Sequence, residues 1–276
     1  MTQKVGPLAV PEPWELVSQG YAEEASLVMR PFSSRAIELL SPARDARVVD
    51  VAAGPGTLSL EIAPRVAEVD AVDFAPAMIA LLDAALAERR ISNVRTRVAD
   101  GQALPFEDGR FDAGFSMFGL MFFPDRARGY AELFRVLKPG GRALVSSWAP
   151  IAESPLLSAM FGAIREIDPS VPVPQRDPNG LENPEVLQRE LEAAGFREVQ
   201  VVPVTHAVDV TANAEEFWVR MTRSSAPIVL MRKRLGEAEW ENGSKRALAF
   251  LERYLKENPS ALTTTALLGY GSKPRG

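Results

Sequence analysis

Through the middle of the chain, apolar residues change repeatedly between the spacing typical of strands and the spacing typical of helices. Short apolar runs predict strands at residues 47–51, 68–73, 94–99, 111–116 and 142–148. Apolar residues three or four positions apart predict helices over 76–90 and 126–137, and also through Leu58, Ile62 and Val66. This alternation of strands and helices indicates a parallel sheet with helices on both faces.

The two ends of the chain have other patterns. Residues 14–40 carry an apolar face at helical spacing, and we expect Pro31 to break this stretch, with a second helix over 33–40. Residues 149–182 are rich in proline, which indicates an inserted cap segment. The remainder predicts a capped helix over 184–194, a strand over 198–204, helices from a capping box at Asn213 and Glu216 to about residue 257, and a strand over 261–271.

These patterns indicate one structural domain built from four segments. They are an N-terminal helical lid (1–44), a sheet-forming core (45–150), the cap insertion (151–182) and a C-terminal part that completes the core and adds a second helical lid (183–276).

Composition narrows the possible functions. The chain has 276 residues, 31 basic and 36 acidic, and a net charge of −5, which argues against a nucleic-acid partner. No apolar run reaches the roughly 18–20 residues of a membrane span, and no signal peptide is evident, so we expect a cytoplasmic protein. The absence of cysteine and the single histidine, His206, exclude disulfides, iron–sulfur clusters and cysteine nucleophiles, and they predict no metal site.

The segment Asp50-Val-Ala-Ala-Gly54-Pro-Gly56 stands between the first strand and the following helix. Glycines there let a ligand approach the backbone closely, next to the unpaired N–H groups of the helix N-terminus. A nicotinamide cofactor favours the pattern G-x-G-x-x-G, but Ser59 takes the place of the third glycine. S-adenosylmethionine carries no phosphate and suits an acidic residue at this strand end, which is Asp50. Both ligand classes remain open on this evidence.

Two more carboxylates follow strand ends. Asp73 ends the second strand and can accept hydrogen bonds from both ribose hydroxyls of either ligand. Asp100 ends the third strand and can accept from the amine of an adenine. Phe74 and Met78 lie where an adenine ring would need apolar walls.

Four stretches, in this order, resemble the successive motifs of class I S-adenosylmethionine-dependent methyltransferases: VVDVAAGPGTLSLEIA, VDAVDFAPAMIALLDAA, VADGQALPFEDGRFDAGFSMFGLMFFPD and LFRVLKPGGRALVSSW. The branch most similar to them includes the ubiquinone and menaquinone C-methyltransferases. The resemblance covers residues 45–150 well, and 10–44 and 183–276 more loosely. Ala52 replaces the family's first glycine, and Ala75 replaces its usual Ser or Thr cap. We expect the turn to survive the extra methyl group of Ala52.

The resemblance implies an α/β fold with a Rossmann-like, seven-stranded, mostly parallel sheet whose last strand, near residues 263–272, is antiparallel. Helices cover both faces, and N-terminal helices form a lid over the cofactor. Together with the strand-end positions, it predicts the following cofactor contacts: Tyr21, Asp50, Ala52, Gly54, Gly56, Asp73, Phe74, Met78, Asp100, Gly101, Gln102, Ser116 and Met117.

Aromatic and methionine side chains in the lid regions and after the fourth strand predict an apolar acceptor site. The candidates are Trp14, Phe118, Met121, Phe122, Trp148 and Trp218. His206 is a candidate general base, since a histidine titrates near neutral pH, and Tyr21 is a second catalytic candidate.

The predicted activity is methyl transfer from S-adenosylmethionine to a small, hydrophobic or aromatic acceptor of secondary metabolism, with S-adenosylhomocysteine as product. The in-line displacement depends on orientation and exclusion of water. The acceptor atom (oxygen, nitrogen or carbon) and the oligomeric state, monomer or homodimer, stay open. The alternatives are a related enzyme that binds the same cofactor but catalyses a non-methylating reaction such as cyclisation, an NAD-dependent oxidoreductase, and a non-enzymatic binding protein.

Overall fold

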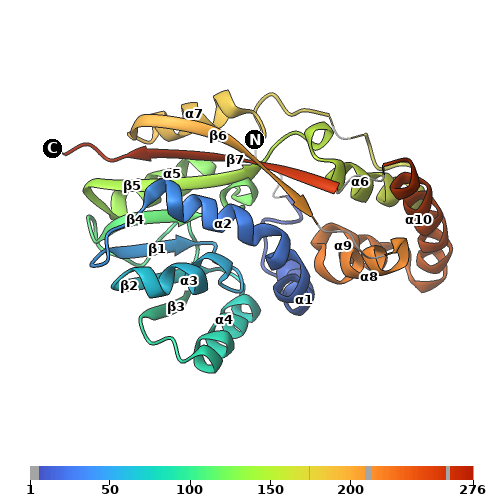
Figure 1. Ribbon diagram of the computed structural model, residues 1–276, viewed down its shortest axis with the longest axis horizontal. Helices are drawn as coiled ribbons and strands as arrows, with labels where there is room; N and C mark the ends of the chain where they lie inside the picture. Colours follow the sequence, from blue (N-terminus) through green and yellow to red (C-terminus); the bar gives the residue numbers. More distant parts are fainter. Residues whose placement is uncertain (1–5, 174, 209–212, 259–261, 276) are drawn as a thin grey trace.

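A seven-stranded sheet forms the centre of the molecule, with strand order β3-β2-β1-β4-β5-β7-β6 (Figure 1). The computed structural model describes residues 6–173, 175–208, 213–258 and 262–275. The strands are β1 (Arg47–Val51), β2 (Glu68–Asp73), β3 (Val94–Val98), β4 (Phe111–Ser116), β5 (Leu137–Trp148), β6 (Arg197–Val208) and β7 (Leu262–Ser272). Neighbouring strands from β3 to β5 are parallel, and β7 runs antiparallel to both β5 and β6.

The strand order reverses direction between β1 and β4, because the chain moves outward from β1 to β3 and then returns to the other side of β1. In open α/β sheets, ligands bind at the carboxyl ends of the strands beside such a reversal. The predicted seven-stranded fold with an antiparallel last strand is therefore confirmed, and it identifies the sheet edge at which a ligand pocket is expected.

Helices cover both faces of this sheet. They are α2 (Ser26–Leu40), α3 (Thr57–Ile62) and α4 (Pro76–Arg89) on one face, and α5 (Arg126–Val136) and α7 (Pro184–Ala193) on the other (Figure 1). Alternation along β5 shows why both faces are apolar: Leu144 joins the core under α2, whereas Ala143 and Val145 join the core under α5 and α7.

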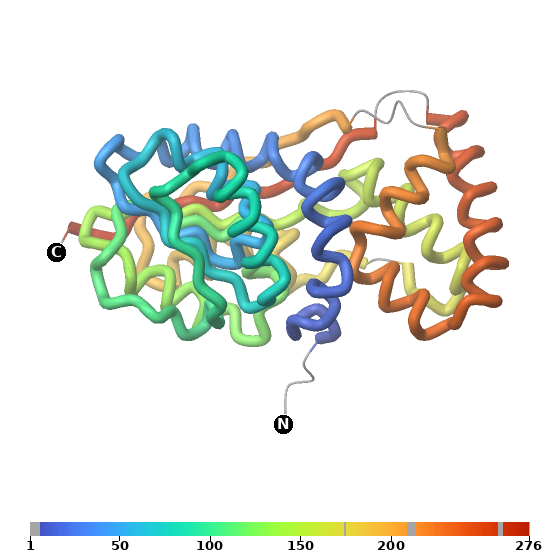
Figure 2. The backbone as a smooth tube through the Cα atoms, turned by 90° about the horizontal axis from the view of Figure 1, so that it is seen from below, coloured from blue at the N-terminus to red at the C-terminus, as the bar shows by residue number. Residues whose placement is uncertain are grey.

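Four further helices form a separate group, the helical lobe, beyond the end of the strands. They are α6 (Pro155–Ile167), α8 (Ala214–Ser224), α9 (Ala226–Leu235) and α10 (Glu237–Glu257). The lobe has its own apolar core, which includes Trp218 stacked on Trp240 with ring centroids 5.7 Å apart. The helix α1 (Glu12–Gly20) lies between the sheet and the lobe and contacts α4, α8 and α9 (Figure 2).

Gly20, at the end of α1, permits this contact, because a Cβ there would lie 2.2 Å from the carbonyl oxygen of Arg223 in α8. Glu23 and Glu24, in the π-helical turn Tyr21–Ala25 that follows, form ion pairs with Arg223 and Arg220. Both sheet and lobe are thus tied to the N-terminal helices.

Local predictions were accurate for the core. β1, β2 and β4 have the expected bounds, and the caps at Asp125, Asn183 and Asn213 each accept a hydrogen bond from the first turn of their helix. Residue 261 of the expected last strand lies outside the described residues.

Two local expectations are corrected, and one segment contains a helix that was not predicted. Pro31 does not break the N-terminal helix but lies inside α2, where Phe32, Ile37 and Leu40 bury the helix against the sheet. That burial offsets the roughly 3 kcal/mol that an internal proline costs. The fifth strand starts at Leu137 rather than at residue 142, because Leu137 already pairs with Phe111. The proline-rich segment contains the helix α6, whose alanine and isoleucine face packs into the lobe.

Candidate functional site

A pocket opens at the carboxyl edge of the sheet, beside the reversal of strand order. The empty space inside it, including the open solvent at its mouth, is about 800 Å³. Its walls come from the N-terminal segment and α1, from the ends of β1, β2 and β3, and from the turn after β4. The lining residues are Leu8, Ala9, Trp14, Tyr21, Ala52, Gly54, Asp73, Phe74, Met78, Ala99, Asp100, Gly101, Gln102, Met117, Phe118, Gly119, Phe122, Phe123 and Pro124.

Asp73, the last residue of β2, supplies a buried carboxylate to this pocket. Its Oδ2 accepts a hydrogen bond from Gly54 N at 2.8 Å and its Oδ1 accepts from Ala75 N at 2.9 Å. Burial raises the pKa of Asp73, while these backbone N–H groups counteract the rise. Two carboxylate oxygens offer about four acceptor positions, so the carboxylate keeps acceptor capacity for a ligand.

The turn after β1 brings the backbone to the pocket wall. Gly54 has a positive φ of 55°, and a Cβ there would meet only the ring of Tyr21, at 4.0 Å, so the glycine leaves this side of the pocket open. Gly56 also has a positive φ, of 88°, but it faces inward: a Cβ there would lie 2.2 Å from a methyl group of Leu82. The first glycine of the turn serves the pocket, and the second serves the packing of α4.

Ala52 retains the turn, as expected, with the backbone in the left-handed region (φ 58°). Its methyl group faces Gly119, where a Cβ would lie 2.3 Å from the Cβ of Ala52. The extra methyl of Ala52 therefore depends on glycine at position 119.

Asp50 is buried behind this turn and does not line the pocket. Its Oδ2 accepts a 2.7 Å hydrogen bond from the hydroxyl of Ser59 in α3. Burial raises the pKa of Asp50 to about 7; the hydrogen bond from Ser59 opposes this rise and the nearby Asp73 adds to it. The two carboxyls thus form an acidic pair, with Asp73 at the pocket wall and Asp50 one layer deeper.

The loop after β3 forms the opposite wall. Asp100 is exposed to the pocket and accepts hydrogen bonds from the backbone N (2.8 Å) and side-chain amide (3.1 Å) of Gln102. The carbonyl oxygen of that side chain accepts from Asp125 N, at the start of α5. Gly101 lies under the ring of Phe123, where a Cβ would approach to 2.5 Å.

Aromatic rings close the pocket on the side of the N-terminal helices. Trp14 meets Tyr21 and Phe122 edge to face, with centroids 5.9 and 5.1 Å apart. The Tyr21 hydroxyl donates to the sulfur of Met29, and burial together with the negative charge of Asp73 raises the pKa of Tyr21. Tyr21 therefore stays protonated at neutral pH.

Several residues expected at the site lie outside the pocket lining. Gly56 and Ser116 are buried beside the turns, Met121 packs into the core, and Trp148 stacks behind Phe118 at 4.2 Å. Trp218 lies in the core of the lobe. His206 packs edge to face against Phe32 at 5.0 Å, and its Nε2 is buried without a hydrogen-bond partner among the described residues.

Six lining residues were missed by the sequence reasoning. Ala99 and Gly119 adjoin predicted residues, so a wider window around the strand ends would have found them. Leu8 and Ala9 carry no local signal, because only the packing of α1 brings them to the pocket. Phe123 and Pro124 follow the predicted aromatic run directly. These six are Leu8, Ala9, Ala99, Gly119, Phe123 and Pro124.

Comparisons with known proteins identify the class of protein. Residues 48–141 match a methyltransferase domain family. The demethylmenaquinone methyltransferase of Thermus thermophilus is 36% identical in an alignment of 182 positions, which covers 59% of this chain and 79% of that protein.

Two solved structures share the fold. The [4+2]-cyclase SpnF superimposes with a TM-score of 0.57 at 23% identity, over 90% of this chain and 82% of that one. A phosphoethanolamine N-methyltransferase of Haemonchus contortus, in complex with S-adenosylhomocysteine, superimposes with a TM-score of 0.55 at 17% identity, over 88% of this chain and 52% of that one.

The chain belongs to the class I S-adenosylmethionine-dependent methyltransferases, in the branch of the demethylmenaquinone enzymes. It is an enzyme of this family, whose cofactor is S-adenosylmethionine. Within the described residues, no helix is long and apolar enough to cross a membrane, and no cluster of three or more potential metal ligands is found.

Proposed function

We propose that the pocket at the sheet edge holds S-adenosylmethionine and that the enzyme methylates a small, apolar acceptor. The observation that carries the proposal is the buried carboxylate of Asp73, which lines a pocket with largely apolar walls and accepts hydrogen bonds from Gly54 N and Ala75 N but forms no ion pair within the described residues. Such an arrangement destabilises the free protein and fits a ligand that brings hydrogen-bond donors.

The lining residues fit the parts of the cofactor. Asp73 would accept from the ribose hydroxyls, and the open face at Gly54 lets the ligand approach the backbone. Phe74 and Met78 would pack against the adenine ring, and Asp100 would accept from its amine. Asp50 would act indirectly, by holding the turn through Ser59.

When bound, the cofactor supplies a methyl group already activated on a sulfonium. The chain then has to orient the acceptor and exclude water, and orientation alone can supply about 7–11 kcal/mol of rate acceleration. Trp14, Phe118 and Phe122 provide the apolar wall for that task. Tyr21 can donate a hydrogen bond but is a poor base, because its pKa is raised.

The acceptor is proposed to be hydrophobic because the side of the pocket next to the turn after β4 is made of Met117, Phe118 and Phe122. The relative from Thermus thermophilus is named for a quinone substrate, which has this character. His206 receives no step in this proposal, since Phe32 stands against it and it does not line the pocket.

The experiment is calorimetric titration with S-adenosylmethionine, S-adenosylhomocysteine and, as control, NAD. We expect micromolar binding of both adenosyl ligands and none of NAD. Incubation with panels of quinols, phenols and phosphorylated alcohols then follows, with mass spectrometry of S-adenosylhomocysteine and of a product heavier by one methylene unit. Consumption of an acceptor without S-adenosylhomocysteine would favour a non-methylating reaction, and turnover confined to the phosphorylated panel would contradict the apolar acceptor.

A further inference from the structure

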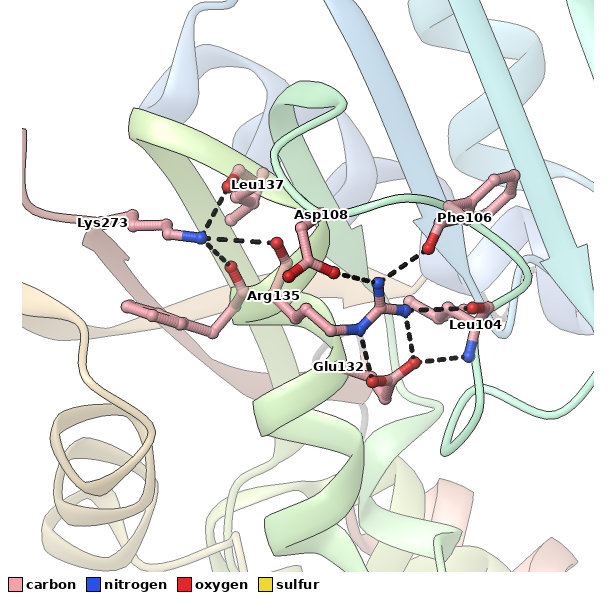
Figure 3. Close-up of polar contacts among 8 residues, drawn as sticks. Leu104, Phe106, Asp108, Glu132, Arg135, Leu137 and Lys273 are labelled. Atoms are coloured by element: carbon pink, nitrogen blue, oxygen red, sulfur yellow. Dashed lines mark hydrogen bonds and ion pairs between the residues drawn. The ribbon is translucent and has the colours of Figure 1, made fainter.

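Arg135, near the end of α5, makes an unusually complete set of contacts with the loop after β3 (Figure 3). Its Nη1 donates to the carbonyl oxygen of Phe106 and to Asp108, both at 2.7 Å, and its Nη2 donates to the carbonyl oxygen of Leu104 at 3.1 Å. Its Nε and Nη2 also form a two-pronged bond to Glu132, at 2.7 and 2.8 Å. A guanidinium carries five N–H groups, and each of the five in Arg135 has a partner here.

Glu132 completes the connection by a direct bond to the same loop. Its Oε2 accepts from Leu104 N at 2.7 Å, so both backbone groups of Leu104 are held by the Glu132–Arg135 pair. The start of α5 holds the loop at a second point, where Asp125 N donates to the side chain of Gln102. One helix therefore fixes the loop over its length.

The helix end that carries Arg135 is itself fixed from the far side. Lys273, beyond β7, donates to the carbonyl oxygen of Leu137 at 2.8 Å (Figure 3). It also donates to the carbonyl oxygen of Phe134 at 2.9 Å and packs over the ring of that residue. This ammonium group thus holds carbonyl oxygens on both sides of the junction between α5 and β5.

The loop matters because Asp100 stands at its start. Asp100 is exposed and lines the pocket, and the hydrogen bonds that its side chain makes within the described part of the chain are to Gln102, two residues further along the same loop. The place of its carboxylate is thus set by the loop, and the loop is set by α5.

We propose that Glu132 and Arg135 are positioning residues for base recognition: they hold the loop so that Asp100 meets the amine of adenine. This inference rests on the proposed function, because it requires the base to lie against Asp100. A conformationally loose loop would leave the ribose and sulfur contacts intact but would weaken the distinction between adenine and a base without the amine.

The test compares S-adenosylhomocysteine with S-inosylhomocysteine, in which a carbonyl replaces the adenine amine. For the wild type we expect a preference of about tenfold or more for the adenosyl ligand, as a hydrogen bond to a charged acceptor gives. Arg135→Lys keeps the charge but cannot span two carbonyls and a carboxylate. We expect it to bind S-adenosylhomocysteine about tenfold more weakly and to bind the inosyl ligand as the wild type does, so that the preference disappears.

Arg126→Lys is the matched control. Arg126 belongs to the same helix, forms a two-pronged bond to Glu190 and a bond to the carbonyl oxygen of Asn179, and is 28% exposed where Arg135 is 30% exposed. It anchors α7 and the segment before it instead of the loop, so its loss should leave the base preference unchanged. Glu132→Asp, which withdraws the carboxylate from Leu104 N, tests the inference again if Arg135→Lys does not fold.

The outcomes separate the inference from the proposed function. Loss of preference in Arg135→Lys or Glu132→Asp but not in Arg126→Lys supports it. Equal weakening of both ligands, or a preference unchanged in both loop variants, overturns it while the proposed cofactor site stands. If the wild type binds neither ligand, the proposed cofactor site fails and the inference fails with it.

Discussion

The pocket edge of the sheet and the helical lobe treat their acidic side chains in opposite ways. At the pocket edge, burial raises the pKa of Asp73 and of Asp50, the latter to about 7. In the lobe and its flanks, acids stay near the surface beside donors: Ser170 and Arg234 lower the pKa of Asp168 to about 2, and Arg232 lowers the pKa of Glu237. The pocket edge thus retains unfavourable charge, which is typical of a binding site, whereas the lobe satisfies its charges and buries apolar surface.

The largest expected effect on stability is in the lobe, and it tests whether the lobe and the pocket edge have separate roles. Trp218→Ala removes a buried ring that stacks on Trp240, and we expect a loss of about 3–5 kcal/mol in the free energy of unfolding. The affinity for S-adenosylhomocysteine should stay near that of the wild type, because Trp218 does not line the pocket. Urea denaturation and calorimetry measure the two quantities. Trp14→Ala is the control that should instead weaken binding. A large loss of affinity in Trp218→Ala would show that the lobe contributes to the binding site and would contradict the comparison.

Asp50→Asn tests whether the buried carboxylate of Asp50 is unfavourable, through the pH dependence of stability. Because the pKa of Asp50 is higher in the folded chain than in the unfolded chain, the folded state holds more protons between about pH 4 and pH 7. The stability contributed by this group therefore falls as the pH rises through that window. In Asp50→Asn, the free energy of unfolding should fall by a few kcal/mol less than in the wild type over the same window.

Urea midpoints across the window measure this slope. Glu237→Gln is the surface control: because the pKa of Glu237 is lowered in the folded chain, its removal should alter the slope only near pH 4 and leave the slope between about pH 5 and pH 7 as in the wild type. An unchanged slope in Asp50→Asn would mean that the buried carboxyl is compensated.

Asp73→Asn addresses the ligand contact itself. The amide keeps one oxygen for a backbone N–H group but removes the charged acceptor, so affinity for S-adenosylhomocysteine should fall about a hundredfold. Asp70→Asn is the matched control, since Asp70 lies buried in the same strand, pairs with Arg110 and does not line the pocket. It should lower stability and leave affinity unchanged. Similar binding by Asp73→Asn and the wild type would remove the ribose contact from the proposal.

The smallest expected effect concerns Gly119 and Ala52, the two small residues that meet at the turns. Gly119→Ala places a methyl group against Ala52 and should cost about 2 kcal/mol of stability. In the double variant Gly119→Ala with Ala52→Gly, the clash is gone and the left-handed position regains glycine, so the thermal midpoint should return to that of the wild type or higher. A double variant no more stable than Gly119→Ala would show that the two positions are not coupled.

The local pattern of apolar and polar residues was sufficient to predict much of the pocket lining. The alternation of strands and helices predicted the parallel sheet, and the carboxyl ends of parallel strands share one edge, so the glycine turn, Asp73 and Asp100 were expected together. Ten of the expected cofactor residues line the pocket: Tyr21, Ala52, Gly54, Asp73, Phe74, Met78, Asp100, Gly101, Gln102 and Met117. Their roles toward the cofactor stay predictions.

By itself, then, the sequence determined the alternation of strands and helices in the core and which acidic side chains follow strand ends, because both depend on neighbours within a few residues. Only the tertiary structure decided that Pro31 stays helical, that Trp218 belongs to the lobe, and that Arg135 reaches the loop of Asp100. These outcomes depend on side-chain directions and on partners distant in the chain, and packing against such partners outweighs local preference.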